Sequence, residues 1–259
     1  MNPNSNATTE PIAIVLAAGQ GKRMQSDLPK VLAQAGGRPL VEYVLDALRG
    51  VGVRRTIVVV GHRAEDVKKA IGHQPGIEFA LQSERRGTGH AVMMCRERIQ
   101  EFTGPVIVVA GDSPMLQIDS LRQLLNEFMQ SGAACVMGTL IHDQPAGLGR
   151  IVRDSAGKFQ RIVEEKDATD EQLLIREVNM STYVFACQPL IESLDRLTNT
   201  NRQGEYYITD VPGILLARGM DVRARPVLKP CEAFSVNTVE DLEIVEQELQ
   251  RRHRGECAS

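Results

Sequence analysis

Glycines followed by cations are the feature of this sequence with the clearest potential for chemistry. Gly19 and Gly21 come directly after the apolar run 12–16 and precede Arg23 and Lys30. Glycine lets the main chain turn sharply and approach a ligand, so backbone N–H groups can reach a phosphate. Arg23 and Lys30 can neutralise a polyphosphate. The segment predicts a nucleotide-handling enzyme, although an ordinary loop after a strand has the same composition.

The spacing excludes two better-known phosphate-binding loops. The dinucleotide fingerprint Gly-x-Gly-x-x-Gly requires a third glycine where this chain has Met24. A Walker-type loop requires Gly-Lys-Ser/Thr, which does not follow at the required distance. What remains is a glycine loop with Arg23 and Lys30 spaced along an extended segment.

A second candidate is Asp112, which follows the apolar run 106–110 in Gly111-Asp112-Ser113-Pro114. A carboxylate at such a strand end can bind a hard divalent cation, and Mg2+ beside phosphates needs only one or two protein ligands. Aspartate is also favoured as a helix N-cap. Asp112 taken alone leaves both interpretations open, and the glycine loop favours the metal.

A third candidate is the polar stretch that begins at Gln82. The Gln82 amide carries the donor and acceptor needed to read the edge of a nucleobase. Gly87 and Gly89 keep backbone groups accessible, and Thr88 is a possible N-cap for a following helix. A plain turn between strand and helix is the alternative. We expect His90 to be a structural hydrogen-bonding residue, because no nearby Ser/Asp pair makes a triad with it.

Short apolar runs alternate with amphipathic segments through the first half of the chain. Strands are expected at 12–16, 56–60, 77–81, 106–110 and 134–140, and helices at 41–48, 64–71, 89–99 and 118–128. This alternation predicts an α/β fold with a largely parallel sheet covered on both faces. Ligands of such sheets bind beyond the carboxyl ends of the strands. Gly19, Gln82 and Asp112 fall at or just after expected strand ends, so we expect them to converge on one crevice.

The second half has a different pattern. Ser155-Ala156-Gly157 predicts a hairpin between 151–154 and 158–164, followed by a strand at 178–185 and a helix at 190–197. Antiparallel pieces added to an α/β core suggest a lid or an acceptor-binding subregion. We expect one domain over residues 11–250, with a disordered leader at 1–10, a charged helix at about 239–252 and a tail at 251–259.

Composition limits the class of protein. The 259 residues carry a net charge of -3, so no global basic field indicates nucleic-acid binding. Five cysteines without a Cys-x-x-Cys pair argue against a disulfide framework or structural zinc and fit reduced thiols. No apolar run approaches the ~20 residues that span a bilayer, and the polar N-terminus lacks a secretion signal. We therefore expect a cytoplasmic protein without membrane partners.

Longer motifs extend the three candidate groups. The first half contains Leu16-Ala17-Ala18-Gly19-x-Gly21-x-Arg23-Met24, Ser26-Asp27-Leu28-Pro29-Lys30-Val31-Leu32, Gln82 with Gly87-Thr88-Gly89-His90-Ala91, and Gly111-Asp112. These resemble the sugar-1-phosphate nucleotidylyltransferases. The second half contains Gly147-Leu148-Gly149-Arg150-Ile151, Ile162-Val163-Glu164-Glu165-Lys166-Asp167-Ala168-Thr169 and Gln203-Gly204-Glu205-Tyr206-Tyr207-Ile208-Thr209-Asp210. These are similar to the uridylyltransferase half of the bifunctional bacterial enzyme that makes UDP-N-acetylglucosamine, and the likeness covers nearly all of residues 11–250.

The resemblance implies a Rossmann-like, GT-A-like three-layer α/β/α fold with an antiparallel sugar-binding subregion. It assigns the nucleotide to Leu16, Ala17, Ala18, Gly19, Gln82, Gly87, Thr88 and Gly111. It places Arg23 and Lys30 on the phosphates, and the cofactor Mg2+ on Asp112 and Asn237. It assigns the amino sugar to Gly149, Glu164 and Asn179, with Tyr207 and Thr209 supporting that pocket.

The implied reaction joins UTP and N-acetylglucosamine 1-phosphate to give UDP-N-acetylglucosamine and pyrophosphate. The acceptor phosphate is already anionic and attacks the α-phosphorus in line, so no side-chain nucleophile is required. Catalysis then consists of positioning and charge neutralisation, with Arg23, Lys30 and Asp112 as the catalytic residues.

Two departures from the family pattern lie near the acceptor sugar. Met180-Ser181 follows Asn179 where the family has a Thr-Gly or similar turn, and Ala110 stands where relatives often carry an aromatic residue. The same chemistry on another sugar 1-phosphate or with dTTP therefore remains open. A non-catalytic nucleotide-sugar sensor is a further alternative, which the presence of all four phosphate and metal residues disfavours.

The bifunctional relatives continue into a left-handed β-helix with hexapeptide repeats. This sequence contains no such repeat after the helix expected at 239–252. We therefore expect neither acetyltransferase activity nor a β-helix-driven trimer, and the oligomeric state stays open.

Overall fold

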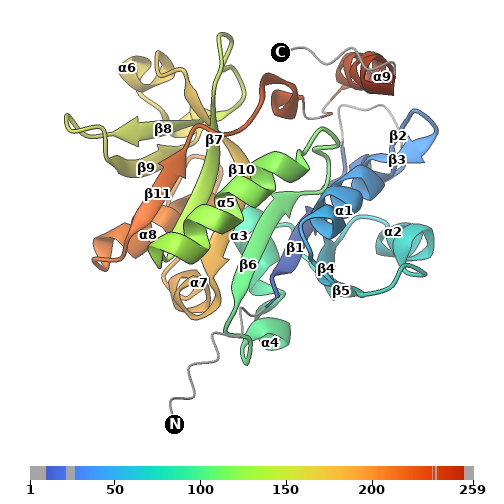
Figure 1. Ribbon diagram of the computed structural model, residues 1–259, viewed down its shortest axis with the longest axis horizontal. Coiled ribbons are helices and arrows are strands. Elements are labelled where there is room, and N and C mark those ends of the chain that lie inside the picture. The colour runs from blue at the N-terminus through green and yellow to red at the C-terminus, as the bar shows by residue number, and fades with distance from the viewer. Residues whose placement is uncertain (1–9, 22–26, 235, 237, 254–259) are drawn as a thin grey trace.

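A nine-stranded mixed sheet with helices on both faces forms the centre of the protein (Figure 1). The computed structural model describes residues 10–21, 27–234, 236 and 238–253. The strands of the sheet are β1 (Ile12–Ala17), β4 (Arg55–Val60), β5 (Ile77–Leu81), β6 (Pro105–Ala110), β7 (Cys135–Ile141), β8 (Gly149–Arg153), β9 (Phe159–Val163), β10 (Glu177–Ala186) and β11 (Val222–Arg225). A small hairpin consists of β2 (Gln34–Ala35) and β3 (Arg38–Pro39).

The helices connect and cover these strands. They are α1 (Leu40–Gly50), α2 (Ala64–Ile71), α3 (Thr88–Met93), α4 (Arg96–Ile99), α5 (Ile118–Ser131), α6 (Asp170–Leu173), α7 (Cys187–Leu194), α8 (Val211–Ala217) and α9 (Val239–His253). Short 3-10 helices are η2 (Lys30–Leu32), η3 (Glu165–Asp167), η4 (Ile208–Asp210) and η5 (Pro230–Ala233).

The main path of the sheet has the order β11-β7-β10-β6-β1-β4-β5. Strands β6, β1, β4 and β5 are parallel neighbours, and β11 is parallel to β7. The expected largely parallel sheet is therefore confirmed. The antiparallel segment expected at 178–185 is not confined to a peripheral subregion, because β10 lies inside the main sheet between β6 and β7. Its first residues consequently share an edge with the carboxyl ends of β6 and β7, and the β8–β9 hairpin joins it there.

Strands β1, β4, β6 and β7 are buried along almost their whole length because both faces of the sheet are covered there. Successive side chains of a strand point to opposite faces. In β1, Ile12 and Ile14 pack with α3, α4, α7 and α8, whereas Ala13 and Val15 pack with α1, α2 and α5. Figure 1 shows α1 and α5 on the near side of the sheet. This is the expected three-layer α/β/α arrangement.

Local expectations differ from the structure in the helices. The helix expected at 89–99 is divided into α3 and α4, and the one expected at 190–197 starts and ends earlier, as α7. Helix α8 was not expected, since it contains Pro212 and Gly213. Pro212 lies in the first turn, where a missing N–H breaks no helical hydrogen bond. Strand β11 was also not expected, because its four residues are too few to show the alternation of apolar and polar side chains that predicts a strand.

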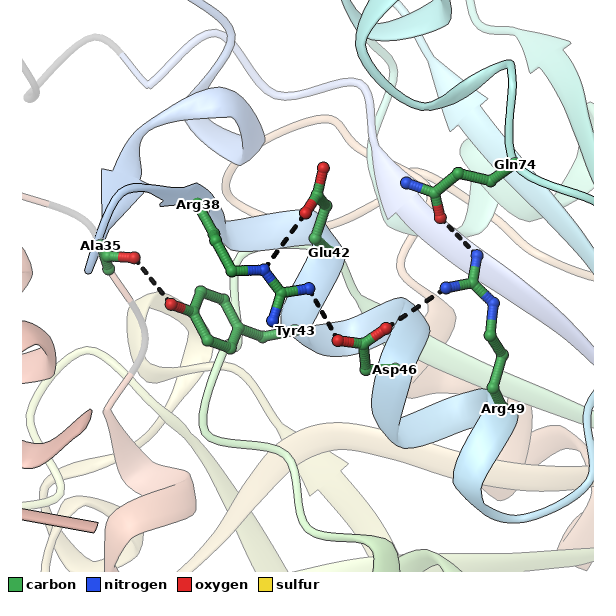
Figure 2. Close-up of polar contacts among 7 residues, drawn as sticks. All are labelled: Ala35, Arg38, Glu42, Tyr43, Asp46, Arg49 and Gln74. Atoms are coloured by element: carbon green, nitrogen blue, oxygen red, sulfur yellow. Dashed lines mark hydrogen bonds and ion pairs between the residues drawn. The ribbon is translucent and has the colours of Figure 1, made fainter. Parts of the chain in front are cut away.

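Polar contacts along α1 attach the β2–β3 hairpin to the body of the protein (Figure 2). Arg38 donates to Glu42 at 3.3 Å and to Asp46 at 2.7 Å. Its guanidinium carbon lies 4.8 Å from the centre of the Tyr43 ring. The Tyr43 hydroxyl donates to the Ala35 carbonyl at 2.7 Å. Because η2 leads directly into β2, these contacts also hold the segment that enters the cavity described below.

The described cysteines form no disulfide. Cys95, Cys135 and Cys187 are buried and Cys231 is partly buried. Burial raises the pKa of Cys95 to about 12 and that of Cys187 to about 11. These thiols are therefore protonated and unreactive at neutral pH, and Cys257 lies outside the described residues.

No helix in the described part of the chain combines the length and apolar character that crossing a bilayer requires. The leader expected at 1–10 lies almost wholly outside that part. The tail expected at 251–259 begins inside α9, which extends to His253.

Candidate functional site

A cavity of about 280 Å³ lies at the carboxyl-terminal edge of the parallel strands. The register explains its position, since Leu16 of β1 pairs with Ala110 of β6, and Val60 of β4 pairs with Leu81 of β5. The residues predicted to act on nucleotide, phosphate or metal that line it are Leu16, Ala18, Gly19, Lys30, Gln82, Gly87, Thr88 and Asp112. Gly19, Gln82 and Asp112 thus meet in one crevice, as expected from their positions at or just after strand ends.

Two of the predicted nucleotide residues do not line this cavity. The Ala17 side chain belongs to the core on the α1 face of the sheet. The Gly111 N–H donates to the Leu16 carbonyl at 2.9 Å, and a methyl group added at Gly111 would lie 3.0 Å from that oxygen. Gly111 therefore brings the start of the Asp112 loop close to β1.

Lys30 and Asp112 form an ion pair in the cavity, with side chains that are 13% and 21% exposed. Gly21, at φ +65°, packs against this lysine, because an added methyl group would lie 2.9 Å from Lys30 Cβ. The N-cap of α5 is Gln117, so Asp112 does not cap that helix. The alternative interpretation of Asp112 is therefore wrong.

The segment before α9 is attached to the Asp112 loop. The Val236 N–H donates to the Asp112 carbonyl at 3.3 Å. Thr238 then caps α9, since its hydroxyl accepts from the Asp241 N–H at 3.2 Å. Asn237, the second predicted metal ligand, stands between Val236 and Thr238 but lies outside the described residues, as does Arg23.

A buried carboxylate fixes the approach of this segment. Glu232 accepts hydrogen bonds from the Gln117 N–H at 3.1 Å, the Ser120 hydroxyl at 2.5 Å and the Lys229 N–H at 2.8 Å. Burial raises the pKa of Glu232, and these hydrogen bonds oppose the increase. The carboxylate therefore ties η5 to the first turn of α5.

The Gln82 side chain is held by two acceptors. Its amide nitrogen lies 3.0 Å from the Gly87 carbonyl oxygen and 3.0 Å from His90 Nδ1. Burial and the Arg86 charge lower the pKa of His90, which favours the neutral ring. The structure therefore gives His90 the structural hydrogen bond that was expected.

The expectation that Thr88 caps the next helix is wrong. The N-cap position is Gly87, and Thr88 is the first residue of α3. The Thr88 hydroxyl instead accepts from the Ile208 N–H at 3.0 Å. A residue of η4 is thereby attached to the loop that follows β5.

Backbone hydrogen bonds join that loop to residues 205–208. The Tyr206 N–H donates to the Arg86 carbonyl at 2.8 Å, and the Gly89 N–H donates to the Tyr206 carbonyl at 2.7 Å. Gly87 has φ +103°, and a methyl group added there would lie 2.4 Å from the Tyr206 oxygen. Only glycine allows this approach. The Gln203–Asp210 motif therefore positions the Gln82 loop.

The predicted sugar-binding residues form a second group. Gly149 of β8 pairs with Asn179 of β10, and Glu164 directly follows β9 beside Gly149. The Thr209 hydroxyl donates to Glu164 Oε1 at 2.8 Å, and the Tyr207 hydroxyl accepts from Gln203 at 2.6 Å. Glu164 and Tyr207 line a different cavity, of about 670 Å³, between β9 and α8.

A backbone irregularity links the two groups. The pairing of β10 with β7 shifts between Asn179 and Thr182, and Ser181 adopts a left-handed φ of +51°. The Ser181 N–H lies 3.3 Å from Asn179 Oδ1, and Ser181 lines the smaller cavity. The unusual Met180-Ser181 sequence thus forms a bulge at the edge of the candidate nucleotide site.

Carboxyl groups with raised pKa values distinguish the larger cavity from the smaller one. Burial raises the pKa of Glu164, the Thr209 hydrogen bond opposes this, and Asp210, Asp167 and Glu205 add to it. Burial and Asp167 also raise the pKa of Asp210. Acidic groups in partly dry surroundings favour neutral or cationic polar ligands over anions.

Sequence reasoning missed Arg85, which lines the smaller cavity, and Gly61, which packs against two residues of that lining. Arg85 lines the cavity and donates to Gln20 at 3.1 Å, which bridges the loops after β1 and β5. A methyl group at Gly61 would lie 2.9 Å from Ala18 Cβ and 3.1 Å from the Gln82 carbonyl oxygen. Gly61 follows β4 at the level of the other strand ends, so the strand order could have revealed it. Arg85 sits in a charged run that gives no such signal.

The arrangement of a glycine loop, a cation, an amide and a carboxylate at one sheet edge matches a known family. The family model for the MobA-like NTP transferase domain matches residues 13–205. The chain belongs to this family. Curated relatives include the "Bifunctional protein GlmU" of Geobacillus thermodenitrificans, 44% identical over 225 residues, and that of Heliobacterium modesticaldum, 45% identical over 242 residues.

These matches cover 87% and 93% of this chain but 49% and 52% of the relatives. The chain thus spans about half the length of the curated proteins it matches. The expected resemblance to sugar-nucleotide uridylyltransferase domains of bifunctional proteins is confirmed.

Solved structures agree on the fold. A UDP-glucose pyrophosphorylase complexed with UDP-glucose aligns with TM-score 0.76 and 15% identity, covering 94% of this chain and 100% of that one. A putative glucose-1-phosphate thymidylyltransferase from Bacillus anthracis aligns with TM-score 0.74 and 18% identity, covering 92% and 94%. The expected GT-A-like nucleotidyltransferase fold is therefore confirmed.

Proposed function

We propose that this chain is a uridylyltransferase that converts UTP and N-acetylglucosamine 1-phosphate into UDP-N-acetylglucosamine and pyrophosphate. The observation that carries this proposal is the meeting of Gln82, Lys30 and Asp112 in one cavity. A base-reading amide, a cation and a carboxylate are the parts that nucleotidyl transfer requires. The curated GlmU relatives support the assignment to sugar-nucleotide chemistry.

In this proposal the chain contributes orientation and charge. Gln82, Gly87 and Thr88 hold the base, while Leu16, Ala18 and Gly19 hold the rest of the nucleoside. Lys30 and Arg23 stabilise the charge that builds on the departing pyrophosphate. The anionic acceptor phosphate attacks the α-phosphorus directly, so the protein supplies no nucleophile.

The donor set fits Mg2+. Asp112 offers carboxylate oxygens at the cavity, and the hydrogen bond from Val236 brings the chain next to Asn237 against the same loop. The described residues contain no cluster of three or more His, Cys, Asp or Glu side chains for a metal. That suits an ion that binds one or two protein ligands and takes the rest of its shell from phosphates and water. When bound, Mg2+ neutralises phosphate charge.

The acceptor sugar is assigned to the second group. Glu164, held by Thr209, accepts a hydrogen bond from the acetamido N–H, and Asn179 and Gly149 contact the sugar from the adjoining strands. Tyr207 supports the pocket. Since UTP and sugar phosphates are cytoplasmic metabolites, the proposal places the protein in the cytoplasm.

The test is direct product formation. Purified protein is incubated with Mg2+, one nucleotide from UTP, dTTP and CTP, and one 1-phosphate from N-acetylglucosamine, glucose, galactosamine and N-acetylmuramate. Pyrophosphate release and mass spectrometry identify the product. UDP-N-acetylglucosamine formed faster than every other product supports the proposal, and a different preferred pair overturns it.

A second candidate keeps the chemistry but changes the acceptor. The Ser181 bulge at the cavity edge favours it, because Met180-Ser181 stands there in place of the Thr-Gly or similar turn of the family. The substrate panel separates the two. Absence of pyrophosphate with every pair, together with nucleotide-sugar binding, would indicate a sensor.

A further inference from the structure

The orientation of the Gln82 amide is decided by its two neighbours. The Gly87 carbonyl oxygen can only accept a hydrogen bond, so the atom 3.0 Å away must be the amide nitrogen. The same nitrogen lies 3.0 Å from His90 Nδ1. Both amide hydrogens are therefore used within the protein when His90 Nδ1 is unprotonated.

This leaves the amide oxygen for a ligand. Gln82 is only 3% exposed yet lines the cavity. An oxygen acceptor suits a base that presents a ring N–H, as uracil and thymine do at N3. Cytosine presents an unprotonated ring nitrogen at that position and would be repelled.

The surroundings of His90 keep Nδ1 available as an acceptor. Its ring lies 6.4 Å from the Tyr206 ring, and the Arg86 guanidinium carbon lies 5.3 Å from the centre of the same tyrosine. Burial and Arg86 lower the pKa of His90, whereas Glu84 opposes them. A neutral histidine with one acceptor nitrogen is the result.

The elements that contact α3 most extensively are η4, α7 and β1. Strand β1 has no ionisable side chain. On α7, Glu192 pairs with Arg218, and Asp210 of η4 lines the larger cavity. The ionisable groups that act on the His90 ring are thus Arg86 and Glu84 of its own loop.

We infer that His90 is a positioning residue for base selection, which holds the Gln82 amide with its oxygen toward the base and so favours uracil over cytosine. The inference rests on the proposed function for its nucleotide class. His90 itself does not touch the substrate. Protonation of Nδ1, or loss of the acceptor, removes one of the two contacts that prevent the amide from rotating.

The experiment measures discrimination between UTP and CTP. Binding of each, with Mg2+ and without any sugar phosphate, is followed by calorimetry for the wild-type chain, His90→Leu and His90→Asn. The asparagine oxygen replaces Nδ1 as an acceptor, whereas leucine cannot. His73→Leu is the matched control, because His73 is exposed.

We expect His90→Leu to lower the UTP/CTP affinity ratio about three- to ten-fold, which corresponds to the loss of one hydrogen bond. His90→Asn restores the ratio and His73→Leu leaves it unchanged. In the wild-type chain the ratio falls as the pH is lowered through the pKa of His90, which burial and Arg86 place below the ordinary imidazole value, and in His90→Asn it does not. The ratio cancels the titration of the phosphate groups, and the series stays above the pH at which cytosine N3 is protonated.

An unchanged ratio in His90→Leu, or a wild-type chain that does not prefer UTP, overturns the inference. If His90→Leu fails to fold, the pH series of wild type and His90→Asn decides, and a flat wild-type ratio overturns it. Failure of the proposed function is a separate result, namely no pyrophosphate release from any nucleotide and sugar pair while the UTP preference persists.

Discussion

Replacing Gly87 by alanine tests how the Gln82 loop is built. The added methyl group would lie 2.4 Å from the Tyr206 carbonyl oxygen, and Gly87 has φ +103° and ψ 173°. That backbone region costs other residues about 1–3 kcal/mol. At roughly 2–4 °C per kcal/mol for a chain of this size, we expect Tm to fall by about 2–12 °C.

Relief of this overlap requires the loop to move away from Tyr206. The movement stretches the Gly89–Tyr206 and Gln82–Gly87 hydrogen bonds, at 2.7 and 3.0 Å. Losing both weakens the bound state by about 1–3 kcal/mol, so the KM for UTP should rise about 5- to 150-fold. The assay is pyrophosphate release at saturating sugar phosphate, with Tm from differential scanning fluorimetry.

Gly132→Ala is the matched control. Gly132 has φ +66° at the end of α5, and an added methyl group would meet nothing within 4 Å. It carries the left-handed backbone cost of about 1–2 kcal/mol without steric overlap. We therefore expect a lower Tm and an unchanged KM for UTP. If Gly87→Ala behaves like this control, the argument that Tyr206 positions the base loop is refuted.

Three further predictions concern carboxylates. Asp112→Ala should abolish turnover while changing the free energy of unfolding by less than about 1 kcal/mol, since its ion pair with Lys30 is partly exposed; full activity with Mg2+ would remove the metal assignment. Glu232→Ala should destabilise the protein by roughly 2–4 kcal/mol in urea unfolding, because three donors lose a buried acceptor, whereas the exposed Glu240→Ala should be neutral. Glu164→Gln tests the raised pKa of Glu164. A carboxyl whose pKa is raised on folding stabilises the protein when protonated and loses that contribution as the pH rises through the folded pKa. The Tm of Glu164→Gln relative to wild type should therefore increase from acidic to neutral pH, and a pH-independent difference would contradict the shift.

The order of elements in the first half was predictable because each strand and helix has its own periodicity. The edges of α2 and β5 match the expected ranges, and the strand ends at Gly19, Gln82 and Asp112 meet as expected. The position of β10 was not predictable, since nothing in the run 178–185 specifies which strands flank it. Strand β11 has only four residues, too few for a strand to be predicted from alternation. Helix α8 was not predictable because Pro212-Gly213 argues against a helix.

Residue types and spacing by themselves determined the α/β class, the covered sheet and the loops where chemistry is expected. Only the tertiary structure decided the contacts between distant segments: Tyr206 against Gly87, and Glu232 against the start of α5. The alternation of apolar and polar residues along a strand or helix involves residues only a few positions apart, so each element can be predicted from its own sequence. The direction of the Gln82 amide depends on a carbonyl and a ring that folding brings to within 3.0 Å, and no local pattern specifies that geometry.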